Sequence, residues 1–206
     1  MFITLEGPEG SGKSTQARLL VEALQQLGQA VLPTREPGGT PIGEQIRDVI
    51  HSLKNTDMQE RTEILLFQAS RAQLVEQVIR PHLAKGGVVV CDRYADSTLA
   101  YQGYGYGRDL VQLRNLIAFA TGGLQPDLTL LLDLDAETGL KRRLSGGEWN
   151  RLDALDLAFH QRVSAGYHHL AQASPERWAI IDADRPIESV QADIQQVVFG
   201  RLGIQD

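Results

Sequence analysis

Short runs of apolar residues alternate along the chain with longer segments in which apolar residues recur every three or four positions. The short runs predict strands at residues 2–6, 30–34, 88–91, 128–134 and 178–181. The longer segments predict helices at residues 14–27, 41–53, 60–84, 96–102, 110–120, 136–144, 155–172 and 186–202. Strands that alternate with helices are typical of a parallel sheet with crossover helices. We therefore expect an α/β fold in a single domain of residues 1–206, built on a parallel five-stranded sheet flanked by helices.

Single residues mark several helix boundaries. Gly28 suits the position after the end of the first helix, where the backbone often turns left-handed. Thr40 followed by Pro41 is typical of a capped helix start. Pro81 is expected to bend the long helix that contains it. Two helices show core-facing apolar spacing, at Leu20, Leu24 and Leu27 and at Ile46, Val49, Ile50 and Leu53.

Composition and charge then exclude several classes of protein. The chain has 206 residues, and 20 Lys plus Arg against 26 Asp plus Glu give a net charge of −6. Proteins that coat nucleic acid or an anionic membrane usually carry the opposite sign, so we expect neither partner. No apolar stretch reaches the roughly 20 residues of a membrane helix, and Cys91 is the single cysteine. We expect a cytoplasmic protein without disulfides or a cysteine-based metal cluster.

The strongest chemical signal is the segment Gly-Pro-Glu-Gly-Ser-Gly-Lys-Ser at residues 7–14, which matches G-x-x-x-x-G-K-[ST] at every position. Its glycines let successive backbone N–H groups surround a phosphate, and the helix that follows adds its positive N-terminal end. Lys13 can reach the outer phosphates, and the Ser14 hydroxyl can bind Mg²⁺. Because a predicted strand precedes the segment and a predicted helix follows it, we expect a nucleoside triphosphate site at Gly7, Pro8, Glu9, Gly10, Ser11, Gly12, Lys13, Ser14 and Thr15.

Two other classes of phosphate-loop protein fit the sequence less well. A regulatory GTPase needs an N-K-x-D or T-K-x-D segment to read guanine, and the chain has neither. Residues 144–148, Leu-Ser-Gly-Gly-Glu, imitate the signature of ABC-type ATPases. In those proteins an apolar strand ending in Asp follows the signature, whereas here the strand at 128–134 precedes it. The order of the segments argues against an ABC-type ATPase.

A second polar site is predicted where the strand at residues 88–91 ends. Asp92 follows that strand, so its carboxylate lies at the sheet edge onto which the phosphate loop opens. Asp92 can hold Mg²⁺ or its waters, and Arg93 can bridge two phosphates. A strand-end Asp that caps the next helix beside a solvated Arg93 is the alternative interpretation.

Several segments together resemble bacterial thymidylate kinases along nearly the whole chain. The matching segments, in the order of the family, are Glu-Gly-Pro-Glu-Gly-Ser-Gly-Lys-Ser from 6, Thr-Arg-Glu-Pro-Gly-Gly-Thr from 34, Phe-Gln-Ala-Ser-Arg from 67, Asp-Arg-Tyr from 92, Thr-Leu-Ala-Tyr-Gln-Gly from 98 and Pro-Asp-Leu-Thr-Leu-Leu-Leu-Asp from 126. The segments from 34 and from 98 are highly specific together, whereas the phosphate loop alone is not. The resemblance implies ATP-dependent phosphorylation of dTMP to dTDP on a P-loop NTPase fold. It also implies a homodimer packed through helices.

Residue chemistry agrees with a site for thymine. Phe67 and Arg71 are four positions apart on one predicted helix, so they share a face. Phe67 can stack on the base and Arg71 can donate to its O4 atom, where cytosine carries an amino group. Thr98, Tyr101 and Gln102 have a second such spacing; in the family, positions like Thr98 and Gln102 line the base and one like Tyr101 lies near the 2′ carbon of the sugar.

The acceptor phosphate is expected to bind to cations that face it in pairs. The substrate positions of the family are matched here by Arg35, Glu36, Arg47 and Arg93. Ser14 and Asp92 are the expected Mg²⁺ residues. A phosphate is already ionised, so the reaction needs positioning and charge compensation rather than a strong general base.

Further positive charge on the transferred phosphoryl group is expected from a lid at about residues 142–153. The family places a catalytic arginine either in the phosphate loop or in the lid, and residues 7–14 contain Glu9 but no arginine. Lys13, Arg93, Glu9, Arg143 and Arg151 are therefore the expected catalytic residues. Relatives carry further arginines where this chain has residues 144–146, so the lid arginine that reaches the transferred phosphate is left open. Arg142 could instead flank adenine beside Asp182.

Two alternatives to a thymidylate kinase stay open on the sequence. One is another nucleoside monophosphate or deoxynucleoside kinase, and the other is a P-loop protein that binds nucleotides without turnover. ADP release measured with different acceptors separates them.

Overall fold

Five parallel strands form the centre of the molecule in the computed structural model, which describes residues 1–146 and 150–204. The strands are β1 (Phe2–Glu6), β2 (Val31–Arg35), β3 (Val88–Asp92), β4 (Leu128–Asp133) and β5 (Trp178–Asp182). Their order in the sheet is β2-β3-β1-β4-β5, and every neighbouring pair is parallel. The predicted α/β class and the five strands are confirmed; β1 has the predicted boundaries, and the boundaries of the other four differ by no more than one residue.

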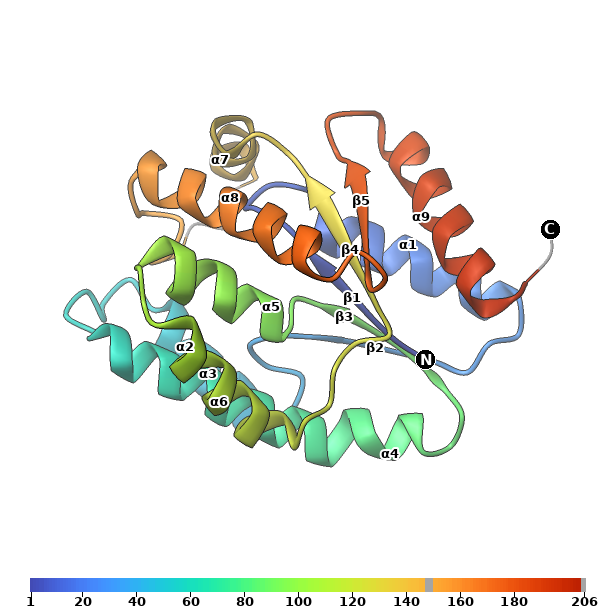
Figure 1. The fold of residues 1–206 in the computed structure, drawn as a ribbon, viewed down its shortest axis with the longest axis horizontal. Coiled ribbons are helices and arrows are strands. Elements are labelled where there is room, and N and C mark those ends of the chain that lie inside the picture. The colour runs from blue at the N-terminus through green and yellow to red at the C-terminus, as the bar shows by residue number, and fades with distance from the viewer. Residues whose placement is uncertain (147–149, 205–206) are drawn as a thin grey trace.

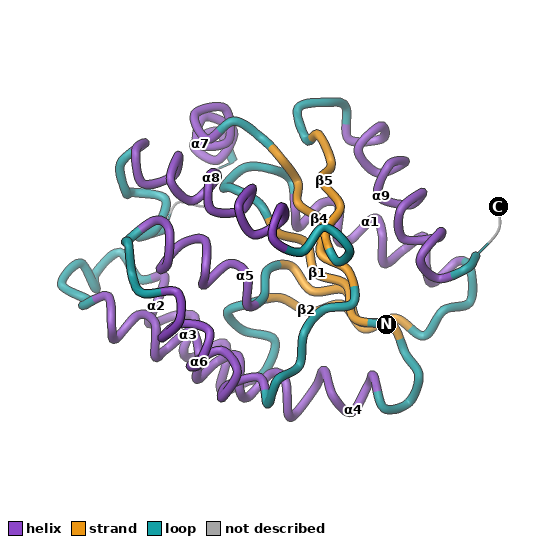
Figure 2. Tube along the Cα trace, viewed as in Figure 1, coloured by secondary structure: helices purple, strands orange, loops and turns teal. Residues whose placement is uncertain are grey.

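Helices connect successive strands and cover both faces of the sheet (Figure 1). The helices are α1 (Lys13–Gln26), α2 (Pro41–His51), α3 (Glu60–Leu74), α4 (Arg80–Leu83), α5 (Ala95–Thr98), α6 (Leu110–Thr121), α7 (Ala136–Ser145), α8 (Leu157–Ala173) and α9 (Ile187–Leu202), with π-helical turns η1 (Val75–Ile79) and η2 (Leu99–Gly105). Helices α1 and α9 pack together on one face. The helices α3, α4 and α8, with η1 and η2, lie on the other side, so the strands form the middle layer (Figure 2).

Alternation along the strands divides the core between these two faces. In β1, Ile3 and Leu5 pack against Leu20 and Leu24 of α1, whereas Phe2 faces the opposite side and packs with Tyr94. All six side chains are buried. A strand buried on both faces needs apolar residues at successive positions, which explains the continuous runs that the sequence shows.

The two predicted helix caps are confirmed. The Thr40 hydroxyl accepts a hydrogen bond from Gly43 N at 2.9 Å, with Pro41 in the first helical position. Gly28 follows the C-cap of α1 with φ of 76°, a conformation that glycine adopts without strain.

Four predictions about helices are corrected. The long helix at residues 60–84 is interrupted at η1, and the helix expected at 96–102 is α-helical only as far as Thr98 before it widens into η2. Of the four core residues expected in the helix at 41–53, only Ile50 is fully buried; Val49 of α2 is 45% exposed, and Leu53, which lies beyond the end of α2, is 55% exposed. Leu27 is also exposed because it caps α1 rather than continuing it. Apolar spacing identifies a face but not what covers that face.

Each strand ends in a charged residue at the same edge of the sheet. These residues are Glu6, Arg35, Asp92, Asp133 and Asp182. In a parallel sheet the carboxyl ends of the strands form the edge where ligands bind. In the part of the chain that the structure describes, no helix combines the length and apolar character needed to cross a bilayer.

Candidate active site

The phosphate loop joins β1 to α1 and begins the site. Gly7, Gly10 and Gly12 have φ values of 143°, 69° and 87°, a region that side chains make unfavourable. Lys13 is buried, and its ammonium group donates to Pro8 O at 2.6 Å and to Ser11 Oγ at 3.2 Å. Burial and the nearby Arg93 guanidinium lower the pKa of Lys13 to about 8, although Glu9 and Asp92 oppose that shift. The ammonium group is thus held inside the loop.

The two predicted Mg²⁺ residues lie together. Ser14 Oγ donates a hydrogen bond to Asp92 Oδ2 at 2.5 Å, which joins the first turn of α1 to the end of β3. A hydroxyl and a carboxylate are oxygen ligands that Mg²⁺ accepts when phosphates and waters supply the rest. Among residues 1–146 and 150–204, no group of three His, Cys, Asp or Glu side chains is arranged to hold a metal.

The phosphate loop is in backbone contact with helix α7. A Cβ atom at Gly10 would overlap the carbonyl oxygen of Gly139, and a Cβ atom at Gly139 would overlap the carbonyl oxygen of Glu9. Neither position has room for a side chain. The helix that leads to the expected lid is therefore seated directly on the loop.

Arg93 lies at the centre of a polar network. Its φ of 68° is rare for a residue other than glycine, and its backbone N–H donates to Leu5 O at 3.0 Å. The guanidinium donates to Glu9 at 2.8 Å and to the hydroxyl groups of Tyr101 and Tyr167 at 3.0 and 3.1 Å. Arg93 is thus a bound group rather than the solvated arginine of the alternative interpretation.

Glu9 is held as a carboxylate by its neighbours. It accepts hydrogen bonds from Arg93 and from the Tyr101 hydroxyl, both at 2.8 Å. Burial by itself would raise the pKa of Glu9, but the positive charges of Arg93 and Lys13 lower it to about 2. A carboxylate, an arginine and a tyrosine ring therefore form one wall beside the phosphate loop.

Arg71 is fully buried and bonded through every N–H group. Its guanidinium donates twice to Glu36 Oε2, at 2.9 and 2.6 Å, and once to Tyr94 O at 3.0 Å. The Nη1 atom donates to Gln68 at 2.9 Å and to Thr98 Oγ1 at 3.1 Å. Contact between Arg71 and a base atom therefore requires that one of these bonds is exchanged.

Gln102 belongs to a second buried cluster, around Glu63. Gln102 Nε2 donates to Glu63 Oε1 at 2.7 Å, and the Tyr106 hydroxyl donates to Glu63 Oε2 at 3.4 Å. Arg151 also pairs with Glu63 and donates to Ile50 O at 3.3 Å. Glu63 thus connects helix α3, turn η2 and the segment that precedes α8.

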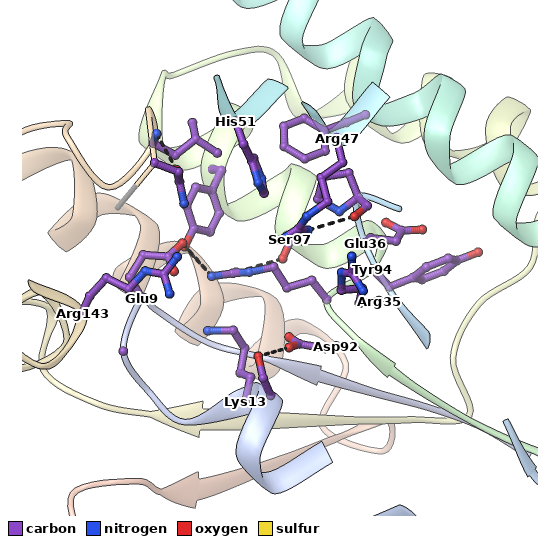
Figure 3. A pocket seen from close by; sticks show the side chains of 18 of the residues that line it. Glu9, Lys13, Arg35, Glu36, Arg47, His51, Asp92, Tyr94, Ser97 and Arg143 are labelled. Carbon is purple, nitrogen blue, oxygen red and sulfur yellow. Dashed lines mark hydrogen bonds and ion pairs between the residues drawn. The ribbon is translucent and has the colours of Figure 1, made fainter. Parts of the chain in front are cut away.

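One cavity of about 420 Å³ brings most of the predicted residues together. Predicted residues that line it are Glu9, Gly10, Gly12, Lys13, Ser14, Thr15, Arg35, Glu36, Arg47, Phe67, Arg71, Asp92, Arg93, Thr98, Tyr101, Gln102, Arg142 and Arg143. Figure 3 shows Glu9 and Arg143 at one side of the cavity and Arg35, Glu36 and Arg47 at the other. Predicted residues outside the lining are Gly7, Pro8, Ser11, Arg151 and Asp182.

The arginines of the expected lid lie in three different places. Arg142 bonds to Ala183 O at 3.1 Å and to Asp184 at 2.6 Å, so it contacts the loop after β5. Arg143 lines the cavity and donates to Asp153 at 3.2 Å. Arg151 contacts Glu63 instead. Residues 147–149 of the expected lid, 142–153, lie outside the described residues.

Arg35 and Arg47 approach the cavity from β2 and α2. Arg35 is the last residue of β2, one position beyond the predicted end of that strand, and pairs with Glu44 at 2.8 Å. Arg47 donates to Pro37 O at 2.9 Å. Both guanidinium groups border the space that faces the phosphate loop.

Several functional positions were missed by the sequence interpretation. The missed lining residues include His51, Ser97, Asn150 and Leu152. Burial and Arg47 lower the pKa of His51 to about 4, so its imidazole is neutral near pH 7. Ser97 lies four positions before Tyr101, and Glu63 lies four positions before Phe67, so helical spacing could have found both.

Comparisons with known proteins agree with this geometry. The family model described as thymidylate kinase matches residues 5–194. A thymidylate kinase of Roseiflexus castenholzii is 56% identical over 96% of this chain and 92% of its own, and one of Herpetosiphon aurantiacus is 50% identical over 98% and 96%. The crystal structure of thymidylate kinase from Ehrlichia chaffeensis superposes with a TM-score of 0.81 at 32% identity, covering 96% of this chain and 98% of that one. The fold is that of the P-loop NTPases, and the chain belongs to the thymidylate kinase family.

Proposed function

We propose that this cavity transfers a phosphoryl group from ATP to dTMP and releases dTDP and ADP. One observation carries the proposal: the phosphate loop and the Arg71, Thr98 and Gln102 side chains line the same cavity. A donor phosphate in the loop and a pyrimidine among those side chains would therefore face each other across it. Thymidylate kinases phosphorylate dTMP to dTDP with ATP, and family membership supports the same reaction here.

ATP is assigned to the side of the loop and α7. The backbone of residues 7–15 surrounds the phosphates, and Lys13 supplies a point charge. Arg142, which bonds to the loop after β5, is assigned to adenine together with Asp182. Asp182 ends β5 and directly precedes Ala183, whose carbonyl oxygen accepts from Arg142.

Mg²⁺ is assigned to Ser14 and Asp92. Their oxygen atoms, 2.5 Å apart, fit an ion that binds one or two protein groups together with phosphates. When bound, the ion neutralises phosphate charge during transfer. The pair joins the phosphate loop to β3, so it places that charge beside Lys13.

Thymine is assigned to the helix α3 side of the cavity. Phe67 is half-buried and can stack on the base. Thr98 Oγ1 accepts from Arg71 at 3.1 Å and from Gln68 at 3.4 Å, which leaves its hydrogen to donate. The Tyr101 ring, fixed through its hydroxyl, is assigned to the sugar, where it would crowd a 2′-hydroxyl.

The acceptor phosphate is assigned to Arg35, Arg47 and Arg93, which border the cavity from three elements. Since the nucleophile is an ionised phosphate oxygen, the protein need not remove a proton from it. The neutral His51, with its low pKa, would be a weak base and is not assigned that role. Positioning of the substrates and positive charge on the transferred phosphate therefore account for the rate enhancement. Arg143, which lines the cavity, supplies part of that charge, and Arg151 supplies more if it exchanges Glu63 for the phosphate.

An assay of ADP release with dTMP, dUMP, dCMP, dGMP and AMP tests this function. Turnover fastest with dTMP supports the assignment, and preference for dCMP or AMP would reject the base site. A Lys13→Met variant is the control, since it keeps the fold but removes the charge in the loop. Binding of ATP without ADP release in the natural protein would indicate a binding protein rather than a kinase.

We also infer a homodimer in the cytoplasm. Helices α2, α3 and α6 pack side by side and expose large apolar side chains, namely Ile42, Val49, Leu53, Leu65, Val111, Leu116 and Phe119. Phe119 is 90% exposed, which is unfavourable unless a partner covers it. The thiol of Cys91 is reduced and buried, as suits a reducing compartment. A Phe119→Glu variant that sediments as a monomer while the natural protein sediments as a dimer supports this surface.

A further inference from the structure

Glu63 controls which way the Gln102 side-chain amide is turned. Glu63 Oε1 and Gln102 Nε2 are 2.7 Å apart, and both side chains are buried. An ionised carboxylate can only accept hydrogen bonds, so the amide must turn its NH₂ group toward Glu63. Gln102 lines the cavity, and within residues 1–146 and 150–204 its side-chain Oε1 atom accepts no hydrogen bond. That oxygen is the amide atom left to contact a ligand.

The second oxygen of Glu63 is also held by donors. Oε2 pairs with the guanidinium of Arg151 and accepts from Tyr106 at 3.4 Å. Both oxygens of Glu63 therefore act as acceptors in this cluster. The Gln102 amide cannot reverse without placing its own oxygen against a carboxylate oxygen.

A carbonyl oxygen toward the base distinguishes pyrimidines by their N3 atom. Thymine carries a hydrogen at N3 and donates, whereas cytosine has a lone pair at N3 and accepts. Gln102 Oε1 matches the first base and repels the second. An amide turned the other way would present NH₂ and favour cytosine.

We propose that Glu63 is a positioning residue that holds Gln102 as a hydrogen-bond acceptor and thereby makes the site select pyrimidines with a donor at N3. The proposal rests on the placement of thymine beside Gln102 in the proposed function. Glu63 acts through Gln102 and does not touch the substrate. Its effect through Gln102 is on the choice between bases, and it is read on binding without ATP, where Arg151 still pairs with Glu63.

The test compares dissociation constants for dTMP and dCMP by calorimetry without ATP. Glu63→Gln is close in shape but can donate, so Gln102 can turn, and we expect the preference for dTMP over dCMP to fall about 10-fold or more. Tyr106→Phe is the matched control: it removes a contact of Glu63 but not the one to Gln102, and it should leave the preference unchanged. In a Gln102→Ala background, Glu63→Gln should alter the preference no further, since the effect passes through that amide.

Two results would overturn the proposal in distinguishable ways. A folded Glu63→Gln variant with the natural preference, in a protein whose preference does change with Gln102→Ala, would reject the role of Glu63 and leave the proposed function intact. An unchanged preference in Gln102→Ala would reject the placement of the base itself. If Glu63→Gln alone unfolds, the double variant Glu63→Gln with Arg151→Gln replaces it. The double variant leaves no buried guanidinium without a carboxylate partner, and its preference for dTMP over dCMP is measured in the same way.

Discussion

Ser14 Oγ donates to Asp92 Oδ2 at 2.5 Å, so one hydrogen bond joins the phosphate loop helix to the end of β3 across 78 positions of sequence. Neighbouring Lys13 and the adjacent Arg93 place two cations beside the same point. Lys13 and Ser14 begin α1, and Asp92 and Arg93 are consecutive at the end of β3, so the sites proposed for the donor phosphate, the metal and the acceptor phosphate adjoin one another. Substitutions at these positions are expected to alter distinct steps of the reaction.

Asp92→Asn is expected to raise the Mg²⁺ concentration needed for half-maximal turnover by about 10- to 100-fold. The amide keeps an oxygen near Ser14 but removes the negative charge that attracts the cation. Turnover measured against Mg²⁺ at saturating ATP and dTMP checks this. An unchanged Mg²⁺ dependence would exclude Asp92 from the metal site.

ATP binding is expected to take up protons above pH 7.5. The pKa of Lys13 is lowered to about 8 by burial and by Arg93, so at pH 8 about half of the ligand-free protein carries a neutral amine. Phosphate charge raises that pKa again, so binding at pH 8 should take up about half a proton, and less as pH falls toward 7. Calorimetry in buffers of different ionisation enthalpy measures this uptake. Lys13→Arg, which stays charged, should abolish it; persistence in that variant would assign the proton to another group.

The Tyr101 ring is expected to exclude ribose, whereas its hydroxyl is expected to fix Glu9 and Arg93. Tyr101→Ala should therefore raise the relative kcat/KM for the ribose form of the substrate by about 10-fold or more, because space opens at the 2′ carbon. Tyr101→Phe keeps the ring and should retain sugar selectivity while turnover falls, since the hydroxyl bonds of 2.8 and 3.0 Å are lost. Equal sugar selectivity in all three proteins would contradict the role of the ring.

Arg143→Ala is expected to lower kcat by about 10³-fold with a small change in KM for dTMP. Arg143 lines the cavity, and removal of its charge affects the transferring phosphate more than the bound acceptor. Single-turnover kinetics with ATP and dTMP measures the chemical step. Lys141→Ala, on an exposed part of the same helix, is the matched control; full turnover in Arg143→Ala would remove this arginine from the proposed mechanism.

Local patterns account for the parts of the fold that the sequence predicted well. The strands are continuous apolar runs because both faces of the sheet are covered, and the phosphate loop is a contiguous segment with its own backbone requirement. The cap at Thr40 and the stop at Gly28 depend on two or three neighbouring residues. Such features need no knowledge of distant parts of the chain.

Contacts between distant segments were not predictable in the same way. Arg151 was expected with the phosphates, but it pairs with Glu63, 88 positions earlier. Val49 and Leu53 have helical spacing yet are exposed, because spacing does not show which element covers a face. The π-helical turn at η2 also places Tyr101 and Gln102 differently from an α-helix, although both still line the cavity.

Gly10 and Gly139 lie in contact with no side chain between them, so the phosphate loop packs backbone to backbone against helix α7, which leads to the expected lid. A displacement of either backbone at this contact must therefore displace the other. A lid transferred from a relative should therefore function only if glycine is kept at both positions. An alanine at Gly10 or Gly139 would tilt helix α7, which carries Arg142 and Arg143, without altering any charged group.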